Sequence, residues 1–259
     1  MVRLTLDINK AIEQNASVYF EKSKKAKRKL EGAKEAIKKT KKQIEKLKKD
    51  RLVEEKKEVK KKQDVKKEWY EKFRWFISSE GFLVIGGRDA TTNEIVIKKH
   101  TDKEDIVFHT DMAGSPFFVI KSEDKKIGEE TLKEVADATL SYSKAWKAGL
   151  TSTEVFYVKP DQVSKKAQPG EFLPKGAFMI RGKTTYIPAD MNIAIGILKN
   201  EKIMGGPLDA IKKNCEKFIE IQQGNEKTGA VAKKIQKKVG GDLDEIIRAT
   251  PAGGVKVKK

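Results

Sequence analysis

The sequence predicts an α+β protein, in which a mixed β-sheet with packed helices follows a long coiled-coil arm and precedes a small, mostly helical tail. Three observations lead to this class. Lysine-rich helical sequence fills the first quarter of the 259 residues, strand-like runs alternate with helical runs in the middle, and glycine pairs separate short helical runs near the end. We therefore expect three parts, at residues 1–67, 68–190 and 191–259.

The first part has the heptad repeat of a coiled coil. The two rows of its seam are Ile12, Tyr19, Ala26, Ala33, Thr40 and Leu47, and Ala16, Ser23, Leu30, Ile37 and Ile44. The repeat loses register near Asp50 and Arg51, where a turn or a change of partner is expected. A single helix with so few large apolar side chains in its seam gains little stability by itself. It therefore needs a partner helix, which is its own second half, another copy or a segment outside this chain.

The middle part begins abruptly at Trp69, after a run of lysines. Short runs rich in β-branched and aromatic residues predict strands at residues 73–77, 82–85, 105–109, 117–121, 155–158, 178–181 and 184–187. Residues 90–99 and 131–147 favour helix, the second with apolar side chains along one face. This order predicts a sheet with helices packed on it.

In the tail we expect one strand, three helices and a frayed end. The strand is expected at 193–198, and a helix with proline in its first turn at 207–221. Two short helices are expected at 228–239 and 242–249, joined at Gly240 and Gly241, and residues 251–259 are expected to be frayed.

The charge balance favours a polyanionic partner. The chain has 56 Lys and Arg against 38 Asp and Glu, a net charge of +18, and residues 1–67 carry 24 of the cations against 11 acids. A run of lysines is also typical of a solvated helix face, so the role of the arm stays open. The single cysteine, Cys215, excludes an internal disulfide, and no secretory leader or membrane-spanning run is visible. We expect a cytoplasmic protein with no membrane partner.

The residues give no indication of catalysis. His100 and His109 have no Cys or carboxylate neighbour at a zinc-ligand spacing, and the glycine pairs 86–87 and 205–206 lack the Lys-Ser/Thr of a phosphate-binding loop. We expect a non-enzymatic protein with no catalytic residue, metal site or cofactor.

Basic residues beside aromatic ones predict contacts with RNA, because a cation binds phosphate while an aromatic ring stacks on an unpaired base. The loop 109–116 is either a tight turn or a binding loop whose free amides and Ser115 hydroxyl contact a phosphate or a base edge. Trp75 is expected in the core, whereas for Trp146 core and stacking roles stay open. The candidate RNA-binding residues are Arg74, Arg88, Lys98, Lys99, His109, Asp111, Gly114, Ser115, Lys144, Trp146, Lys147, Lys165, Lys166, Arg181 and Lys183.

Several long motifs resemble the NFACT-R domain of the NEMF/RqcH family. The run from Trp69 to Ala90, followed by Asn93-Glu94, resembles the opening of that domain. The later segments 109–116, 143–147, 162–166, 169–173 and 178–183 follow in the same order. Asn15-Ala16 with Tyr19-Phe20 resembles the family's coiled-coil entry, and residues 205–207 its archaeal C-terminal extension.

The resemblance implies a factor of ribosome-associated quality control. It would bind the large ribosomal subunit RNA and an obstructed peptidyl-tRNA and support message-independent tailing of the stalled chain. The family's NFACT-N half, implicated in tRNA recruitment, has no match here; that half, or a second copy, is an expected partner of the coiled coil. One departure is Ala113, where many relatives have His. The alternative is a stand-alone nucleic-acid-binding or sensing protein unrelated to tailing.

Overall fold

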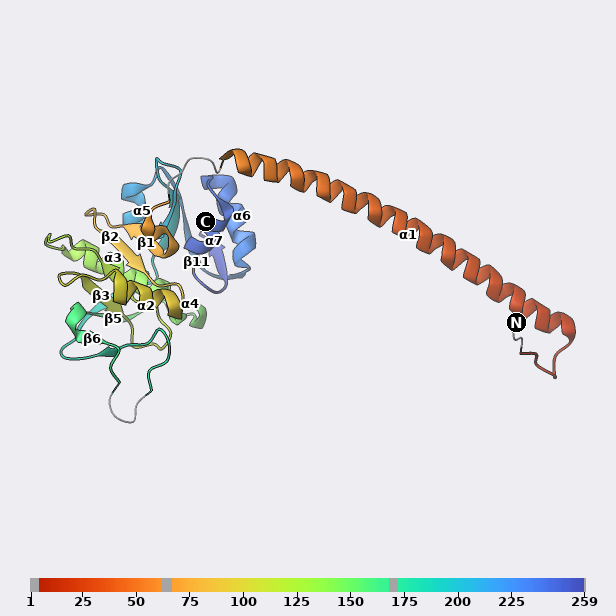
Figure 1. Cartoon of the computed structure of the whole chain (residues 1–259), viewed down its shortest axis with the longest axis horizontal. Helices are drawn as coiled ribbons and strands as arrows, with labels where there is room; N and C mark the ends of the chain where they lie inside the picture. The colour runs from red at the N-terminus through yellow and green to blue at the C-terminus, as the bar shows by residue number, and fades with distance from the viewer. Residues whose placement is uncertain (1–4, 62–66, 168–171, 259) are drawn as a thin grey trace. The chain divides into compact units, whose positions relative to one another are not determined.

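The computed structural model describes residues 5–61, 67–167 and 172–258. The chain divides into two compact units, Met1–Lys67 and Glu68–Lys259. A long helix occupies the first unit and a combination of helices and antiparallel sheets the second (Figure 1), so the predicted α+β class is confirmed.

The arm is one helix, α1 (Ile12–Lys61), of 50 residues. It continues through Asp50 and Arg51, so the expected turn there is absent; neither glycine nor proline interrupts this stretch. The seam side chains of Leu30, Ile37 and Ile44 are exposed, and within the described residues no second helix covers them.

The start of α1 is fixed by a short segment that folds back on it. Asn15 is buried, and its carboxamide accepts from the amide of Asp7 and donates to the carbonyls of Asp7, Lys10 and Ala11. The Tyr19 hydroxyl bonds to the backbone of Thr5. These bonds pair backbone groups of residues 5–11 with side chains of the first turns of α1 and so hold the segment against the helix.

The main sheet of the second unit has six strands in the order β1-β2-β4-β3-β5-β8. All of its pairings are antiparallel, which corrects the predicted mixed sheet. Helix α2 (Ala90–Lys99) joins two parallel strands, β2 and β3, but β4 lies between them. The strands are β1 (Arg74–Ile77), β2 (Leu83–Gly86), β3 (Ile106–His109), β4 (Phe118–Ile120), β5 (Ser152–Val158) and β8 (Thr185–Asp190).

Two helices replace the single helix predicted at 131–147. Helix α3 (Glu129–Ser141) packs on strands of the main sheet, and α4 (Lys144–Ala148) follows after a break. Helix α4 begins after Ser143 because the Ser143 hydroxyl accepts a hydrogen bond from the amide of Ala145 and so caps the new helix at its N-terminus. The break turns the chain so that Lys144 and Lys147 are exposed while Trp146 is buried.

The tail contains a second sheet, in the order β10-β9-β11-β12, which the prediction of a mostly helical extension did not include. The predicted helix 207–221 ends at Asn214, and residues 217–221 form a strand that pairs with β9. The end is not frayed, because β12 pairs with β11. The elements are β9 (Ile193–Ile197), β10 (Ile203–Gly206), α5 (Leu208–Asn214), β11 (Lys217–Glu226), α6 (Thr228–Val239), α7 (Leu243–Ala249) and β12 (Val255–Val257).

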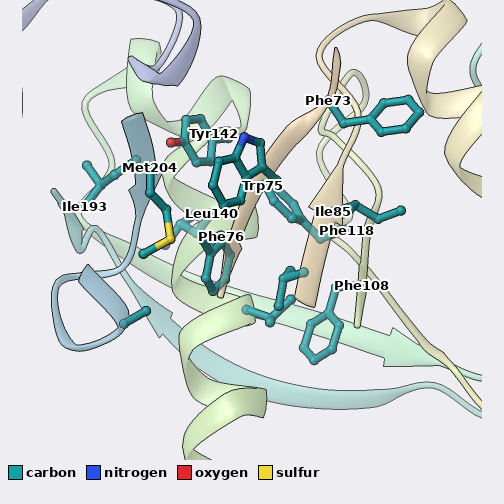
Figure 2. Packing of buried hydrophobic residues seen from close by; sticks show 14 of the residues in the cluster. Phe73, Trp75, Phe76, Ile85, Phe108, Phe118, Leu140, Tyr142, Ile193 and Met204 are labelled. Atoms are coloured by element: carbon teal, nitrogen blue, oxygen red, sulfur yellow. The ribbon is translucent and has the colours of Figure 1, made fainter. Parts of the chain in front are cut away.

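The two sheets share one hydrophobic core (Figure 2). Phe76 of β1 is fully buried, and a side chain at Gly206 of β10 would meet its ring at 2.9 Å. Met204 accepts a bond from the amide of Ile77 through its sulfur. Strand β10 therefore packs directly on β1, and residues from the tail complete the core of the domain.

Two further strands pair only with each other and form a separate two-stranded sheet. It consists of β6 (Val163–Ser164) and β7 (Met179–Ile180), preceded by a short 3-10 helix at Pro160–Gln162. A similar 3-10 turn, Trp69–Lys72, opens the second unit. None of the described helices combines the length and apolar character needed to cross a bilayer.

Candidate functional site

A cavity of about 490 Å³ lies between four segments of the second unit. These are the start of α2, the loop 110–116, the start of α4, and residues 174–178. The cavity brings together several residues predicted from the sequence: Arg74, Arg88, His109, Gly114, Ser115, Lys144 and Lys147. A volume of this size is typical of pockets for small ligands.

Positive charge surrounds the cavity. Arg88, Lys144, Lys147 and Lys175 are exposed, and none of them makes an ion pair with a described residue. The acid that lines it, Asp89, caps α2 by accepting from the Thr92 amide at 2.8 Å, and such bonds lower the pKa of Asp89. The cavity therefore carries an excess of positive charge, which favours an anion over a cation as a ligand.

A further cation lies deeper, at Arg74. Its guanidinium stacks on the ring of Tyr142, 4.0 Å from the centroid, and donates to the carbonyl of Arg248 at 3.3 Å. Burial lowers the pKa of Arg74, and burial raises the pKa of Tyr142 to about 12. No carboxylate of the described chain pairs with Arg74, so its charge adds to the positive potential of the cavity.

The loop 109–116 is a tight turn held by its own hydroxyls. Thr110 and Ser115 bond to each other, and Ser115 also donates to the carbonyl of Met112 at 2.9 Å. The Ser115 hydroxyl is therefore engaged inside the loop. Gly114 has a φ of +84°, and within the described chain the amides of Ala113 and Gly114 have no acceptor. Those amides are the polar groups that the loop leaves free for a ligand.

His109 supports this loop from β3. Its Nε2 donates to the carbonyl of Ser115 at 3.1 Å, and its ring stacks on Phe117 with centroids 4.1 Å apart. Burial lowers the pKa of His109, so the neutral ring is favoured. A neutral His109 positions the loop and adds no charge to the cavity.

The wall formed by residues 174–178 depends on Lys165. Its ammonium lies 2.8 Å from the carboxylate of Glu94 on α2 and donates to the carbonyls of Pro174 and Ala177. The Gly176 amide donates to the same carboxylate, and a side chain at Gly176 would meet the Cα of Ala90 at 2.5 Å. Lys165 is thus bound within the protein.

The other predicted residues lie outside the cavity lining. Trp146 is buried and donates from its indole nitrogen to the carbonyl of Gly254 at 3.0 Å, which makes it part of the core. Lys98 pairs with Glu94, Asp111 accepts from the Tyr186 hydroxyl, and Arg181 donates to the carbonyl of Lys166. Lys99, Lys166 and Lys183 are exposed.

Sequence reasoning missed Lys175, Tyr142 and Phe178, all of which line the cavity. Lys175 lies in Pro174-Lys175-Gly176, a turn signal with a cation at its tip, so a search for basic turns would have found it. Phe178 lies edge-on to Phe117, with centroids 5.4 Å apart. The described residues contain no group of three or more side chains suited to hold a metal ion.

The family model and the relatives that match this chain point to the same family of proteins. The model described as "NFACT protein RNA binding domain" matches residues 72–182, which include all of the cavity lining except Ala252. The archaeal Rqc2 homologue aRqcH of Methanocaldococcus jannaschii is 43% identical over 194 residues, 72% of this chain and 29% of the relative.

Two eukaryotic relatives are named as ribosome quality control complex subunits. The NEMF homologue of Drosophila melanogaster is 44% identical over 118 residues, 45% of this chain and 12% of the relative. Human NEMF is 39% identical over 175 residues, 67% of this chain and 16% of the relative. The chain therefore spans less than a third of the length of these relatives.

Proposed function

Because this chain is similar to the C-terminal part of the archaeal RqcH and NEMF family of ribosome quality control proteins and carries their NFACT RNA-binding domain, we propose that it binds the RNA of the large ribosomal subunit when an obstructed peptidyl-tRNA is present. The cavity face of the domain makes the contact. Its place of action is the cytoplasm, and it binds no membrane.

The cluster of unpaired cations around the cavity supports this proposal most strongly. Arg88, Lys144, Lys147 and Lys175 come from three separate segments, yet they line one cavity. Like charges repel, so such a grouping costs stability unless an anion binds there. Among anions, RNA is favoured by the matched RNA-binding family model, and its backbone offers the phosphates that such cations bind.

In this proposal the chain is an adaptor and the ribosome is the catalyst. The chain anchors to the large subunit and supports message-independent C-terminal tailing of the stalled polypeptide, in which ribosomal RNA forms the peptide bond. Recruitment of tRNA needs an NFACT-N half. The exposed seam side chains Leu30, Ile37 and Ile44 offer that half, or a second copy of this chain, a helix on which to pack.

Co-sedimentation with purified ribosomal subunits tests the proposal. We expect the chain to sediment with large subunits that carry peptidyl-tRNA, and to be released as salt rises from 50 to about 200 mM, because phosphate contacts are salt-dependent. Small subunits from the same preparation are the control. Equal binding to small subunits or to DNA of the same length would favour a general nucleic-acid sensor over a quality control factor.

A further inference from the structure

We propose that the cavity captures one unpaired nucleotide of the bound RNA, with the base inside and the adjoining phosphates at the cations around the opening. This inference rests on the RNA-binding function proposed above and assigns a ligand to its central site. The lining supports it in two ways, through the state of its polar side chains and through the position of its free donors.

The hydroxyl and carboxamide side chains inside the cavity form hydrogen bonds with backbone groups of the protein itself. The Ser143 hydroxyl donates to the carbonyl of Leu140 at 2.7 Å, and the Tyr142 hydroxyl to that of Ala249 at 2.7 Å. The carboxamide of Asn93 accepts from the amide of Phe117 at 3.2 Å, and its nitrogen faces the carbonyl of Ser115. With Ser115 engaged as well, these groups are not free to read the edge of a base.

Apart from the Arg74 guanidinium, which stacks on Tyr142 and donates to backbone carbonyls, what remains inside is largely apolar surface. Phe117, Phe178, Ile180, Pro116 and Ala113 all line the cavity. Such a surface accepts the face of any base, since every base has a flat π surface and stacking does not depend on its edge. The cavity is therefore suited to a base that has left its helix and is unsuited to selecting among the four bases.

The free donors lie where a phosphate would be needed. Lys144 packs over the loop, because a side chain at Gly114 would meet its Nζ at 2.9 Å. The unpaired amides of Ala113 and Gly114 belong to the same turn, so one phosphate can be held by the ammonium and by backbone amides. Arg88 and Lys175 come from two other segments that line the cavity.

The number of cations favours a nucleotide within a chain over a free one. A single phosphate is satisfied by the Lys144 ammonium and the loop amides. Arg88, Lys147 and Lys175 then remain for phosphates on either side of the captured nucleotide. An RNA backbone supplies these phosphates, because each neighbouring nucleotide carries one. Extruding a base is least costly where it is already unpaired, so bulges and loops are the expected targets.

Fluorescence anisotropy with three RNAs tests the inference. They are a fully paired duplex, the same duplex with one bulged nucleotide, and the same bulge without its base. We expect the bulged RNA to bind at least about fivefold more tightly than the duplex, because one stacked base contributes that much. The abasic bulge should bind like the duplex, and bulged A, C, G and U should agree within about threefold.

A variant that fills the cavity is the decisive control. Ala113 is exposed and lines the cavity, so Ala113→Trp should remove the preference for the bulge while the duplex still binds through the cations. Ala148→Trp adds the same side chain at an exposed position on α4 outside the lining, and it should keep the preference.

Three results would overturn the inference: equal affinity of the wild-type chain for bulge and duplex, a bulge preference that survives Ala113→Trp, or displacement of bulged RNA by free AMP or UMP at equal concentration. If no RNA binds in a salt-dependent way, the proposed function itself is wrong. If duplex RNA binds but bulges do not bind better, the proposed function stands and only the nucleotide site is disproved.

Discussion

The carboxylate of Glu94 and the ammonium of Lys165 lie 2.8 Å apart, and this ion pair fixes one wall of the cavity to helix α2. Glu94 also accepts from Lys98 and from the amide of Gly176, both at 3.2 Å. These bonds lower the pKa of Glu94 to about 2. A lysine expected to bind RNA thus positions the turn 174–178, which carries Lys175 and Phe178 into the cavity.

Replacing Lys165 should loosen that turn. In Lys165→Met the carbonyls of Pro174 and Ala177 lose their donor, so we expect faster hydrogen exchange at the Gly176 amide and weaker RNA binding. Hydrogen exchange followed by mass spectrometry checks this. Lys166→Met is the matched control, because the Lys166 side chain is exposed and makes no ion pair with the described residues. Equal exchange in both variants would contradict the positioning role.

Trp146 should behave as a core residue. Trp146→Phe loses the bond to the carbonyl of Gly254 and should cost about 1 kcal/mol of unfolding free energy, whereas Trp146→Ala should cost about 3–5 kcal/mol. Urea denaturation measures both. The affinity of Trp146→Phe for RNA should stay unchanged, while Lys147→Ala should weaken RNA binding with little change in stability. If Trp146→Phe lowers the affinity for RNA, Trp146 stacks on an RNA base and is more than a core residue.

Trp146 and Lys147 are adjacent in the sequence, but only the exposure of Lys147 agrees with its predicted role. Local pattern was sufficient for helix α2, whose bounds were predicted as they occur, and for most strands of the main sheet. It could not decide whether Trp146 stacks on RNA or packs, because the acceptor of its indole lies 108 residues away. The bond from Gly176 to Glu94 spans 82 residues, so the role of Lys165 was hidden for the same reason.

The tail errors have a related cause. Residues 217–221 and 255–257 are short, and they become strands only through pairing, of β11 with β9 and of β12 with β11. Three of the cations around the cavity, Arg88, Lys144 and Lys147, were recognised because charge is visible in the sequence, whereas Lys175 was missed. The grouping of these cations with residues 174–178 was not predicted, since it depends on the chain folding back to α2.

Stability should fall in mildly acidic solution because of His109. Burial lowers its pKa below the ordinary value of 6.5, so the unfolded chain binds a proton first. The stability present above pH 6.5 is therefore lost as the pH falls from 6.5 towards the lower pKa of the folded state. Urea denaturation from pH 7.5 to 5.0 should show this loss, and His109→Gln should show a smaller one.

His100 provides the comparison for that measurement. Its pKa is lowered too, mainly by burial, and its ring stacks on Trp69 with centroids 4.5 Å apart. His100→Gln should therefore remove a separate part of the pH dependence. An identical pH profile for wild type and His109→Gln would mean that His109 does not stay neutral in the folded chain.

Charge reversal on the cavity rim should weaken RNA binding without unfolding the domain. Arg88 precedes the start of α2 and Lys144 begins α4, and both side chains are exposed and line the cavity. Arg88→Glu and Lys144→Glu should each lower affinity for RNA and reduce the slope of log affinity against log salt by about 0.7 to 0.9 for each phosphate that the variant no longer neutralises. Because exposed charges contribute little to folding, the unfolding free energy should change by less than about 0.5 kcal/mol.

Lys99→Glu is the control, since it changes the net charge by the same amount at a distant position. Lys99 lies in the last turn of α2, and ten helical residues span about 15 Å, more than a Debye length at physiological salt. Lys99 was itself a predicted RNA contact, so the comparison also decides between the two ends of the helix. A loss of affinity in Lys99→Glu equal to that in Arg88→Glu would mean that net charge governs binding, and the cavity would have no special role.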